Sequence, residues 1–322
     1  MRSLVLVALC SCLSGCLVGP DLERYAERYG EASASTGVTA TFLGCASLVF
    51  RDGEEAVMTD GFFTRPGKLA VLLDRPVESD PETVSAALHR IGLSRLSAVV
   101  PVHSHFDHAL DSPVVAAQTG GVVLGSATTK AIADGLDLNN AIVATLGQVY
   151  VYPPFEITLY ESRHAPVSDG GPPFPGSLDA PLPMPAPISH YLEGGSFSVH
   201  VEHSSAGSVL VHGSAGFVTG ALDDVRADAV YLGIGGLSSL EEGEPGTIER
   251  YWNEVVVATG AKIVRPIHHD DFTRPFGSER AFPTWIFDDP ADSLDVIEKL
   301  AERDGVRLEM LPMLEPVSFA GP

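Results

Sequence analysis

The amino-acid sequence predicts an α/β sandwich, in which apolar strands alternate with amphipathic helices. Residues 96–102 and 229–234 are continuous apolar runs of the length of buried strands. Residues 81–91 and 248–256 place apolar side chains at the 3.6-residue spacing of a helix that packs on one face. Strands and helices therefore follow one another along the chain, as in a sheet covered by helices.

The composition predicts a globular protein without a nucleic-acid partner. Of the 322 residues, 45% are hydrophobic and 19% are charged, which allows a large buried core. With 20 basic and 42 acidic residues, the formal net charge is −22. A surface this acidic repels a phosphate backbone, so we expect a small-molecule substrate and no nucleic-acid partner.

The first fifteen residues, 1–15, have the features of a bacterial lipoprotein signal peptide. Arg2 is a positive n-region, residues 4–9 are an apolar h-region, and Leu13-Ser14-Gly15-Cys16 resembles a lipobox. Cleavage would leave Cys16 as a lipid-bearing first residue and anchor the protein at the cell envelope, on the outer membrane or periplasmic side where an outer membrane exists. The alternative is an ordinary secretory signal or short anchor, although the apolar run is far shorter than the ~20 residues that span a bilayer.

Residues 16–36 are expected to be a tether, and residues 37–322 a single domain. The tether ends in a run of Ser, Ala and Gly that is typical of flexible linkers. The mature chain keeps only Cys16 and Cys45, so no structural disulfide is expected. Cys45 lies in an apolar strand context and is expected to be a small buried side chain rather than a nucleophile.

The elements of the domain can be placed in order. We expect strands near residues 37–43, 46–51, 55–59, 96–102, 121–124, 148–152, 155–162, 197–201, 208–211, 229–234, 262–267 and 306–311. We expect helices near residues 81–91, 111–118, from 126 onward, 248–256 and 290–302. Asp80 and Asp289 are the predicted N-caps of two helices, because each precedes a proline that can take the first helical position.

Metal-ligand side chains are concentrated in His103-Ser104-His105-Phe106-Asp107-His108, directly after the strand expected at residues 96–102. Imidazole nitrogen and carboxylate oxygen are ligands of Zn²⁺, and imidazole also binds other transition metals. His103 and His105 project to the same side of an extended chain, whereas Asp107 and His108 lie where the chain turns toward a helix. The segment can therefore bind two adjacent metal ions; the alternative is a solvated histidine-rich loop.

This His-x-His-x-Asp-His motif after a strand resembles that of the metallo-β-lactamase superfamily, and the resemblance covers roughly residues 37–318. It implies a four-layer αββα sandwich with the metals at one edge of the two sheets. The ligands that the resemblance implies are His103, His105 and His164 for the first metal and Asp107, His108 and His268 for the second. Asp60 matches an acidic residue that lies close to the metals in the family.

The resemblance also implies a hydrolase, with zinc as the expected metal. Zinc lowers the pKa of bound water to about 7, and the resulting hydroxide attacks a carbonyl or phosphorus centre. Asp107 is the expected catalytic residue that orients the hydroxide and carries a proton to the leaving group. His269 is a candidate proton donor or substrate contact, or a spectator beside the ligands. The sequence looks most similar to the ascorbate-phosphate lactonase and phospholipase D-like branch, whose members act on lactones and phosphodiesters.

One departure from the family pattern leaves other classes open. Ser214 stands where the superfamily usually has an aspartate that bridges the two metals. A neutral hydroxyl brings no charge to offset the repulsion between two dications. The alternative function is therefore a metal-binding lipoprotein module with little or no turnover. A redox-active di-iron protein requires an acidic residue near His164 and usually a flavin domain, and the sequence shows neither.

Residues 165–189 form a proline-rich insertion, with eight of the 24 prolines in the chain. Proline prevents regular helix and sheet but limits freedom, so a semi-rigid Ω-like loop is expected. Because the insertion follows His164, we expect it to form a lid or wall of the substrate cleft; the alternative is a solvated excursion. His190, His200, His203 and His212 are not expected to be ligands.

Overall fold

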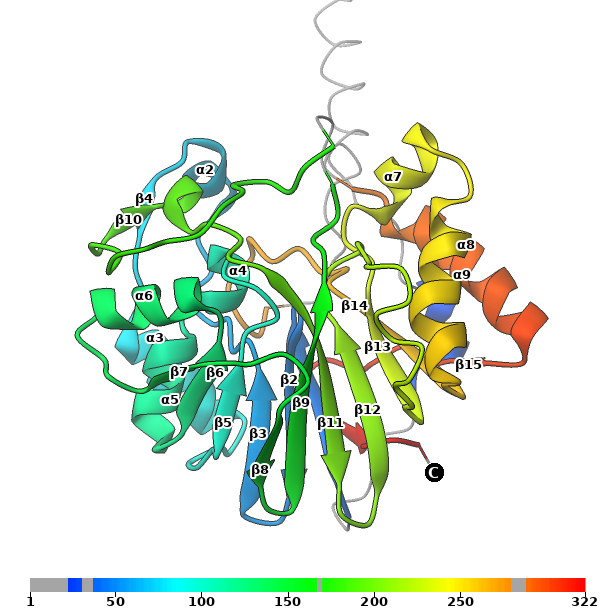
Figure 1. The fold of residues 1–322 in the computed structure, drawn as a ribbon, viewed down its shortest axis with the longest axis horizontal. Coiled ribbons are helices and arrows are strands. Elements are labelled where there is room, and N and C mark those ends of the chain that lie inside the picture. Colours follow the sequence, from blue (N-terminus) through cyan, green and yellow to red (C-terminus); the bar gives the residue numbers. More distant parts are fainter. Residues whose placement is uncertain (1–22, 31–36, 167–169, 279–287, 322) are drawn as a thin grey trace, which may run out of the picture.

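The protein is described by a computed structural model that covers residues 23–30, 37–166, 170–278 and 288–321. Two seven-stranded sheets lie face to face at the centre, and helices cover the outer face of each sheet (Figure 1). This is the four-layer αββα arrangement, so the expected fold class is confirmed. The signal peptide and lipobox predicted from the sequence lie outside the described residues.

The first sheet has the strand order β16-β1-β2-β3-β5-β6-β7. Its strands are β1 (Thr39–Gly44), β2 (Ser47–Asp52), β3 (Glu55–Thr59), β5 (Ala98–Val100), β6 (Val122–Gly125), β7 (Ala141–Val143) and β16 (Pro316–Ser318). The first three strands are antiparallel, whereas β3, β5, β6 and β7 are parallel. Parallel pairing brings the carboxyl ends of β5 and its neighbours to one edge of the sheet, which is the edge where the motif begins.

The second sheet has the strand order β15-β14-β13-β12-β11-β9-β8. Its strands are β8 (Val149–Tyr152), β9 (Phe155–Ser162), β11 (Ser196–His203), β12 (Gly207–His212), β13 (Ala229–Gly233), β14 (Ile263–Ile267) and β15 (Arg307–Leu308). Strands β12 to β15 are parallel, and β8, β9 and β11 join them as antiparallel neighbours. The strands β9 and β14 both end at the same edge of the molecule as β5 (Figure 1).

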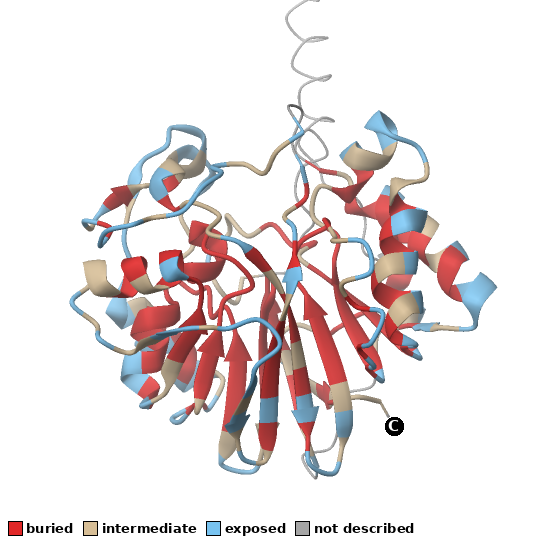
Figure 2. Cartoon of the chain, in the orientation of Figure 1, coloured by how far each residue is buried: buried red, intermediate tan, exposed pale blue. Residues whose placement is uncertain are grey.

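The inner faces of the sheets form a dry core. Val57 and Val100 of the first sheet and Leu159 and Val211 of the second belong to one cluster of buried side chains. Figure 2 shows the central strands mostly buried, whereas β7, β8 and parts of β9 and β11 are exposed or half-buried, as are the loops and the outer faces of the helices. Burial on both faces explains why these strands have continuous apolar runs in the sequence rather than alternating ones.

Helices seal the outer faces. The helices on the first sheet are α3 (Pro81–Arg90), α4 (Phe106–Ala109), α5 (Ser112–Thr119) and α6 (Ala127–Gly135), and those on the second are α7 (Leu237–Gly243), α8 (Thr247–Trp252), the π-helix η3 (Asn253–Val257) and α9 (Pro290–Asp304). The Asp80 and Asp289 side chains cap α3 and α9 as predicted, because each accepts a hydrogen bond from a backbone N–H of the first turn. A short helix α2 (Lys68–Leu72) lies near the pair β4 (Pro76–Val77) and β10 (Ala186–Pro187).

Several expectations are corrected by the structure. The helix α7 and the strand β16 are additional elements, and β5 and β15 are shorter than predicted. The insertion at 165–189 contains the two-residue strand β10 and ends within the 3-10 turn η2 (Ile188–His190), where no regular structure was expected. Pairing of β10 with β4 fastens the insertion to the domain.

Part of the predicted tether packs on the domain. Residues 23–30 contain the 3-10 helix η1 (Glu23–Arg28), and the buried Tyr25 side chain donates a hydrogen bond to the carbonyl oxygen of Ala291 in α9. Among the described residues, no helix is both long enough and apolar enough to cross a membrane.

Candidate metal centre

The site is assembled from the ends of three strands and the turn of one hairpin. His103 follows β5, His164 follows β9, and His268 follows β14, so both sheets contribute to it. Cys45 lies in the two-residue turn between β1 and β2. A strand end is a rigid platform, because the strand is held by its neighbours along its whole length.

The first group of donors consists of His103, His105 and His164, each of which offers a ring nitrogen within 4.8 Å of the other two. The Nε2 atom of His103 and the Nδ1 atom of His105 are 2.9 Å apart. The structure thus brings together the three residues that the family resemblance implies as ligands of the first metal.

Backbone carbonyls determine which nitrogen of these rings carries the proton. The Nε2–H of His105 donates to the carbonyl oxygen of Pro173 at 2.8 Å, and the Nδ1–H of His164 donates to that of Ala165 at 2.7 Å. A carbonyl oxygen can only accept, so Nδ1 of His105 and Nε2 of His164 keep their lone pairs for a metal. Burial lowers the pKa of both histidines to about 4, which keeps them in the neutral, metal-binding form.

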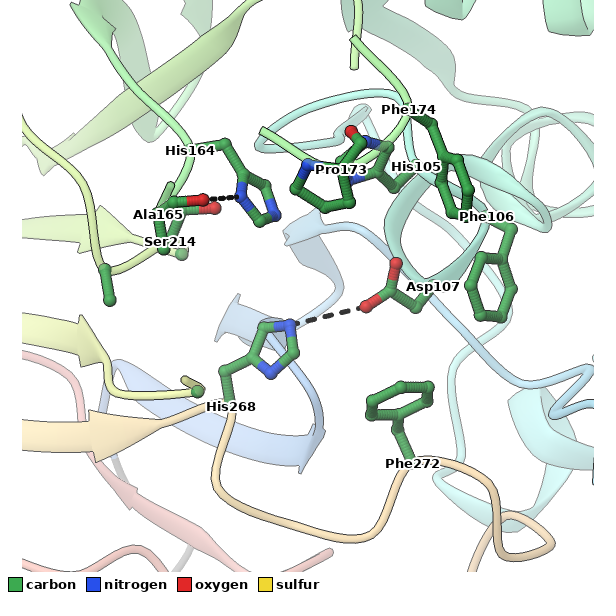
Figure 3. Close-up of a pocket in the computed structure, with 13 residues that line it drawn as sticks. His105, Phe106, Asp107, His164, Ala165, Pro173, Phe174, Ser214, His268 and Phe272 are labelled. Atoms are coloured by element: carbon green, nitrogen blue, oxygen red, sulfur yellow. Dashed lines mark hydrogen bonds and ion pairs between the residues drawn. The ribbon is translucent and has the colours of Figure 1, made fainter. Parts of the chain in front are cut away.

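The second group of donors consists of Asp107, His108, His268 and Cys45. The Nε2 atoms of His108 and His268 are 3.3 Å apart, and each is 3.4 Å from Oδ2 of Asp107. Figure 3 shows the ring of His268 and the carboxylate of Asp107, which face the cavity. The three residues predicted for the second metal therefore converge, and a cysteine joins them.

Asp60 fixes the orientation of the His108 ring by binding the ring nitrogen that does not face the other donors. The Nδ1–H of His108 donates to Oδ2 of Asp60 at 2.7 Å, and the backbone N–H of Val102 donates to Oδ1 at 2.9 Å. This leaves Nε2 of His108 for a metal, which is the supporting role expected of Asp60. Burial alone raises the pKa of Asp107, but His108 and His268 outweigh burial and hold this pKa below its usual value.

Cys45 is the donor that sequence reasoning missed. The side chain is fully buried, as predicted, yet its Sγ atom lies 3.3 Å from Nε2 of His268 and 3.7 Å from Oδ2 of Asp107. Burial and the neighbouring carboxylates, Asp107 first, raise the pKa of the thiol well above its ordinary value. The apolar context of Cys45 in the sequence predicted its burial but gave no sign of the residues it meets.

The hairpin turn and the end of β14 are held together around Cys45. The backbone N–H of His268 donates to the carbonyl oxygen of Cys45 at 2.7 Å, and the N–H of Cys45 donates to Oδ1 of Asp270 at 2.6 Å. Arg65 forms a buried ion pair with Oδ2 of Asp270 at 3.1 Å and donates to the carbonyl oxygen of Leu43. Burial opposes the charge on Asp270, but Arg65 holds its pKa below the usual value.

Three residues of the site have a left-handed backbone. The φ angles are 53° for Cys45, 55° for Asp60 and 58° for His268. A left-handed backbone conformation costs about 1–2 kcal/mol at a residue with a side chain. A two-residue hairpin turn requires a positive φ at Cys45, the backbone N–H of His268 donates to the carbonyl oxygen of Cys45, and that of Asp60 donates to the carbonyl oxygen of Val100.

His269 and Ser214 occupy different surroundings. The fully buried His269 ring packs against Phe42, with ring centroids 5.8 Å apart, and is not among the residues that line the cavity. Its role as a proton donor stays a prediction. The Ser214 hydroxyl lies 3.5 Å from Nδ1 of His103 and lines the cavity, so the residue at the position expected for a bridging acid lies beside the first donor group.

The other histidines lie elsewhere. His212 bonds to the carbonyl oxygen of Gly216, and His200 to that of Arg226. His203 faces Asp52. None of these, nor His190, belongs to either donor group among the described residues.

A cavity of about 220 Å³ opens onto both donor groups. His105, His164, Asp107 and His268 point into it (Figure 3). Its remaining wall is largely apolar and contains Phe106, Ala165, Pro173, Phe174, Gly213, Ala215, Gly235 and Phe272. Pro173 and Phe174 belong to the insertion, so this segment contributes to the cavity wall as expected.

An αββα sandwich with two adjacent groups of metal donors at a shared sheet edge is the architecture of a class of metal-dependent hydrolases. Residues 40–252 match the family described as the metallo-beta-lactamase superfamily. The chain belongs to this superfamily, as its motif predicts. A comparison with curated protein sequences found no match.

Solved structures share the fold at low sequence identity. Igni18, a metallo hydrolase from Ignicoccus hospitalis, is 14% identical with a TM-score of 0.52 over 88% of this chain and 98% of that chain. A possible metal-dependent hydrolase from Veillonella parvula is 13% identical, with a TM-score of 0.50 over 87% and 99%. CmlA, a diiron β-hydroxylase from Streptomyces venezuelae, is 12% identical, with a TM-score of 0.53 over 89% of this chain and 55% of that chain. These similarities show the fold alone.

The substitution Gly44→Ala tests the packing that places Cys45. Gly44 has a φ of +97°, and a Cβ atom there would lie 2.2 Å from Nη2 of Arg65 and 2.6 Å from Oδ2 of Asp270. We expect the free energy of unfolding of the metal-free protein to fall by about 4 kcal/mol, since both backbone strain and a broken buried ion pair contribute. Denaturant titration measures this change.

Gly53→Ala is the matched control. Gly53 also has a positive φ, +58°, but no atom lies within 4 Å of the position that a Cβ atom would take there. The control should cost only about 1 kcal/mol. Equal losses for the two variants would show that the Arg65–Asp270 pair does not constrain the turn.

Proposed function

We propose that this protein is a zinc-dependent hydrolase that cleaves a small ester, lactone or phosphodiester substrate. The observation that carries the proposal is the convergence of two adjacent donor groups on one cavity, with a ring nitrogen or carboxylate oxygen of each facing it. A zinc ion bound there supplies acidified water and neutralises the negative charge that develops on the substrate oxygen.

The residues of the chain perform the remaining tasks. Asp107 lines the cavity and is held ionised by His108 and His268, so it can orient the attacking water and accept or return a proton. The apolar side chains of Phe106, Phe174 and Phe272 exclude bulk water from the cavity, which strengthens the electrostatic interactions at the reacting atoms.

The chemistry of the donors supports zinc over hard cations. Calcium and magnesium take oxygen ligands, whereas the described groups offer five imidazoles, one carboxylate and one thiol. Imidazole and thiolate ligands are those of zinc and other transition metals. CmlA is a diiron enzyme on the same fold, so metal analysis is part of the test of this proposal.

Cavity size and charge support a small, partly apolar substrate. A volume of about 220 Å³ admits only a small molecule or one group of a larger molecule. The net charge of −22 disfavours nucleic acid. Together with the resemblance to the ascorbate-phosphate lactonase and phospholipase D-like branch, these features support lactones and phosphodiesters as the first substrates to test.

Metal content and hydrolysis of a substrate panel test the function directly. The zinc-loaded protein should contain two zinc ions and hydrolyse bis-p-nitrophenyl phosphate, a simple lactone or nitrocefin. We expect His164→Ala to lower kcat/KM by at least about 100-fold, because it removes a metal ligand. His200→Ala is the matched control, since His200 lies outside both donor groups. Equal rates for His164→Ala and the parent protein would contradict the proposal.

Ser214 motivates the second candidate function, a metal-binding module at the cell envelope without efficient turnover. The hydroxyl occupies the position of the usual bridging acid and brings no charge. One zinc ion or none, with no turnover even in Ser214→Asp, would favour this function over the hydrolase.

Phe174→Ala tests whether the insertion contacts substrate. The ring lies 6.0 Å from that of His105 and is 37% exposed at the cavity wall. We expect KM for a substrate with an apolar group to rise about fivefold with little change in kcat, because ground-state and transition-state contacts are lost equally. Asp179→Ala, in the same insertion but outside the residues that line the cavity, should leave KM unchanged. An unchanged KM in both variants would show that Phe174 of the insertion does not contact the substrate.

We also propose that the protein is anchored at the cell envelope through a lipid on Cys16, on the strength of the sequence pattern at residues 1–16. Cys16→Ser should move the protein from the membrane fraction to the soluble fraction of a bacterial expression host. Retention of the variant in the membrane fraction would overturn this localisation.

A further inference from the structure

Five of the six distances among the four donors of the second group are close to those of a tetrahedral zinc site. Zinc–nitrogen and zinc–oxygen bonds of about 2.0–2.1 Å in a tetrahedron place neighbouring N and O ligands about 3.3–3.4 Å apart, and a zinc–sulfur bond of about 2.3 Å places sulfur about 3.5–3.6 Å from them. The three distances among Asp107, His108 and His268 are 3.3, 3.4 and 3.4 Å. The two distances from Sγ of Cys45 are 3.3 and 3.7 Å.

The position of the thiol is imposed by the chain around it. Its backbone is left-handed, and the turn is held on both sides by hydrogen bonds to His268 and Asp270. A two-residue hairpin turn takes a positive φ whatever its side chain does, but the hydrogen bonds to His268 and Asp270 fix where this turn lies. They place Sγ 3.3 Å from Nε2 of His268 and 3.7 Å from Oδ2 of Asp107, beside the other donors of the group.

The charge of the two donor groups is a second, independent reason to expect Cys45 to bind metal. Two dications side by side repel each other, and the superfamily position that usually carries a bridging carboxylate is Ser214 here. Among the described residues, the two donor groups contain one carboxylate, that of Asp107. A thiolate from Cys45 would supply a second negative charge, from a distant part of the sequence.

We propose that Cys45 is the fourth ligand of the second metal position, where it closes a Cys-Asp-His-His tetrahedron. This proposal rests on the proposed function only for the presence of metal. Four protein donors fill a tetrahedral position, whereas the three histidines of the first group leave one position open toward the cavity, as in catalytic zinc sites. Both positions border the cavity, but only the first would keep a coordination position free for water or substrate.

X-ray absorption at the zinc edge of the full-length, zinc-loaded protein tests the proposal without any activity assay. We expect one sulfur neighbour at about 2.3 Å, shared over two zinc ions, in addition to nitrogen and oxygen neighbours. Cys45→Ser should lose the sulfur neighbour and bind one zinc ion fewer. A matched variant with Cys10, Cys12 and Cys16 replaced by serine should keep the sulfur neighbour and both zinc ions, because it retains Cys45 as its one cysteine.

The outcomes distinguish a failure of the proposal that Cys45 is a ligand from a failure of the proposed hydrolase function. Zinc surrounded by nitrogen and oxygen alone, or a sulfur neighbour that persists in Cys45→Ser, overturns the proposal, as does failure of the protein to bind zinc. If Cys45→Ser does not fold, the sulfur neighbour in the triple-serine variant still assigns the ligand. A zinc–sulfur bond without turnover of any substrate would uphold Cys45 as a ligand and contradict the proposed hydrolase.

Discussion

Seven donor atoms, five of them on buried residues and two on the half-buried His164 and His268, converge on two adjacent points and impose the main physical constraint on this structure. Such atoms repel one another and have lost their hydration, so their burial is costly without a cation between them. The chain limits this cost by giving the far side of several rings a partner, such as the carbonyl oxygens of Pro173 and Ala165 and the carboxylate of Asp60. These partners also fix the tautomers, so the groups are prepared for metal before it binds.

The sandwich provides the rigidity that this arrangement requires. Strands from both sheets end at one edge, and the residues that follow them are held by contacts across that edge rather than by their own loops. The clearest case is the turn containing Cys45, which is bonded to the end of β14 through His268 and Asp270 and backed by Arg65. A shift in either sheet would therefore change the spacing of the second donor group.

Most of the fold and the donors of the His-x-His-x-Asp-His motif could be predicted because their signals are local, contained in apolar runs, helix caps and one short segment. His164 and His268 carry no such signal by themselves and were predicted from the resemblance to the family pattern, because each follows a strand. Cys45 could not be recognised, because its partners lie 62 and 223 residues away and only the closed sandwich brings them together. The docking of Tyr25 on α9 was missed for the same reason, since a short polar segment gives no sign of its distant partner.

The most direct test of the account is a crystal structure of the zinc-loaded protein, with anomalous scattering measured on both sides of the zinc edge. We expect two anomalous peaks, one among His103, His105 and His164 and one among Cys45, Asp107, His108 and His268. A single peak at the three histidines, with the Cys45 side chain turned away from His268, would contradict the two-position metal centre.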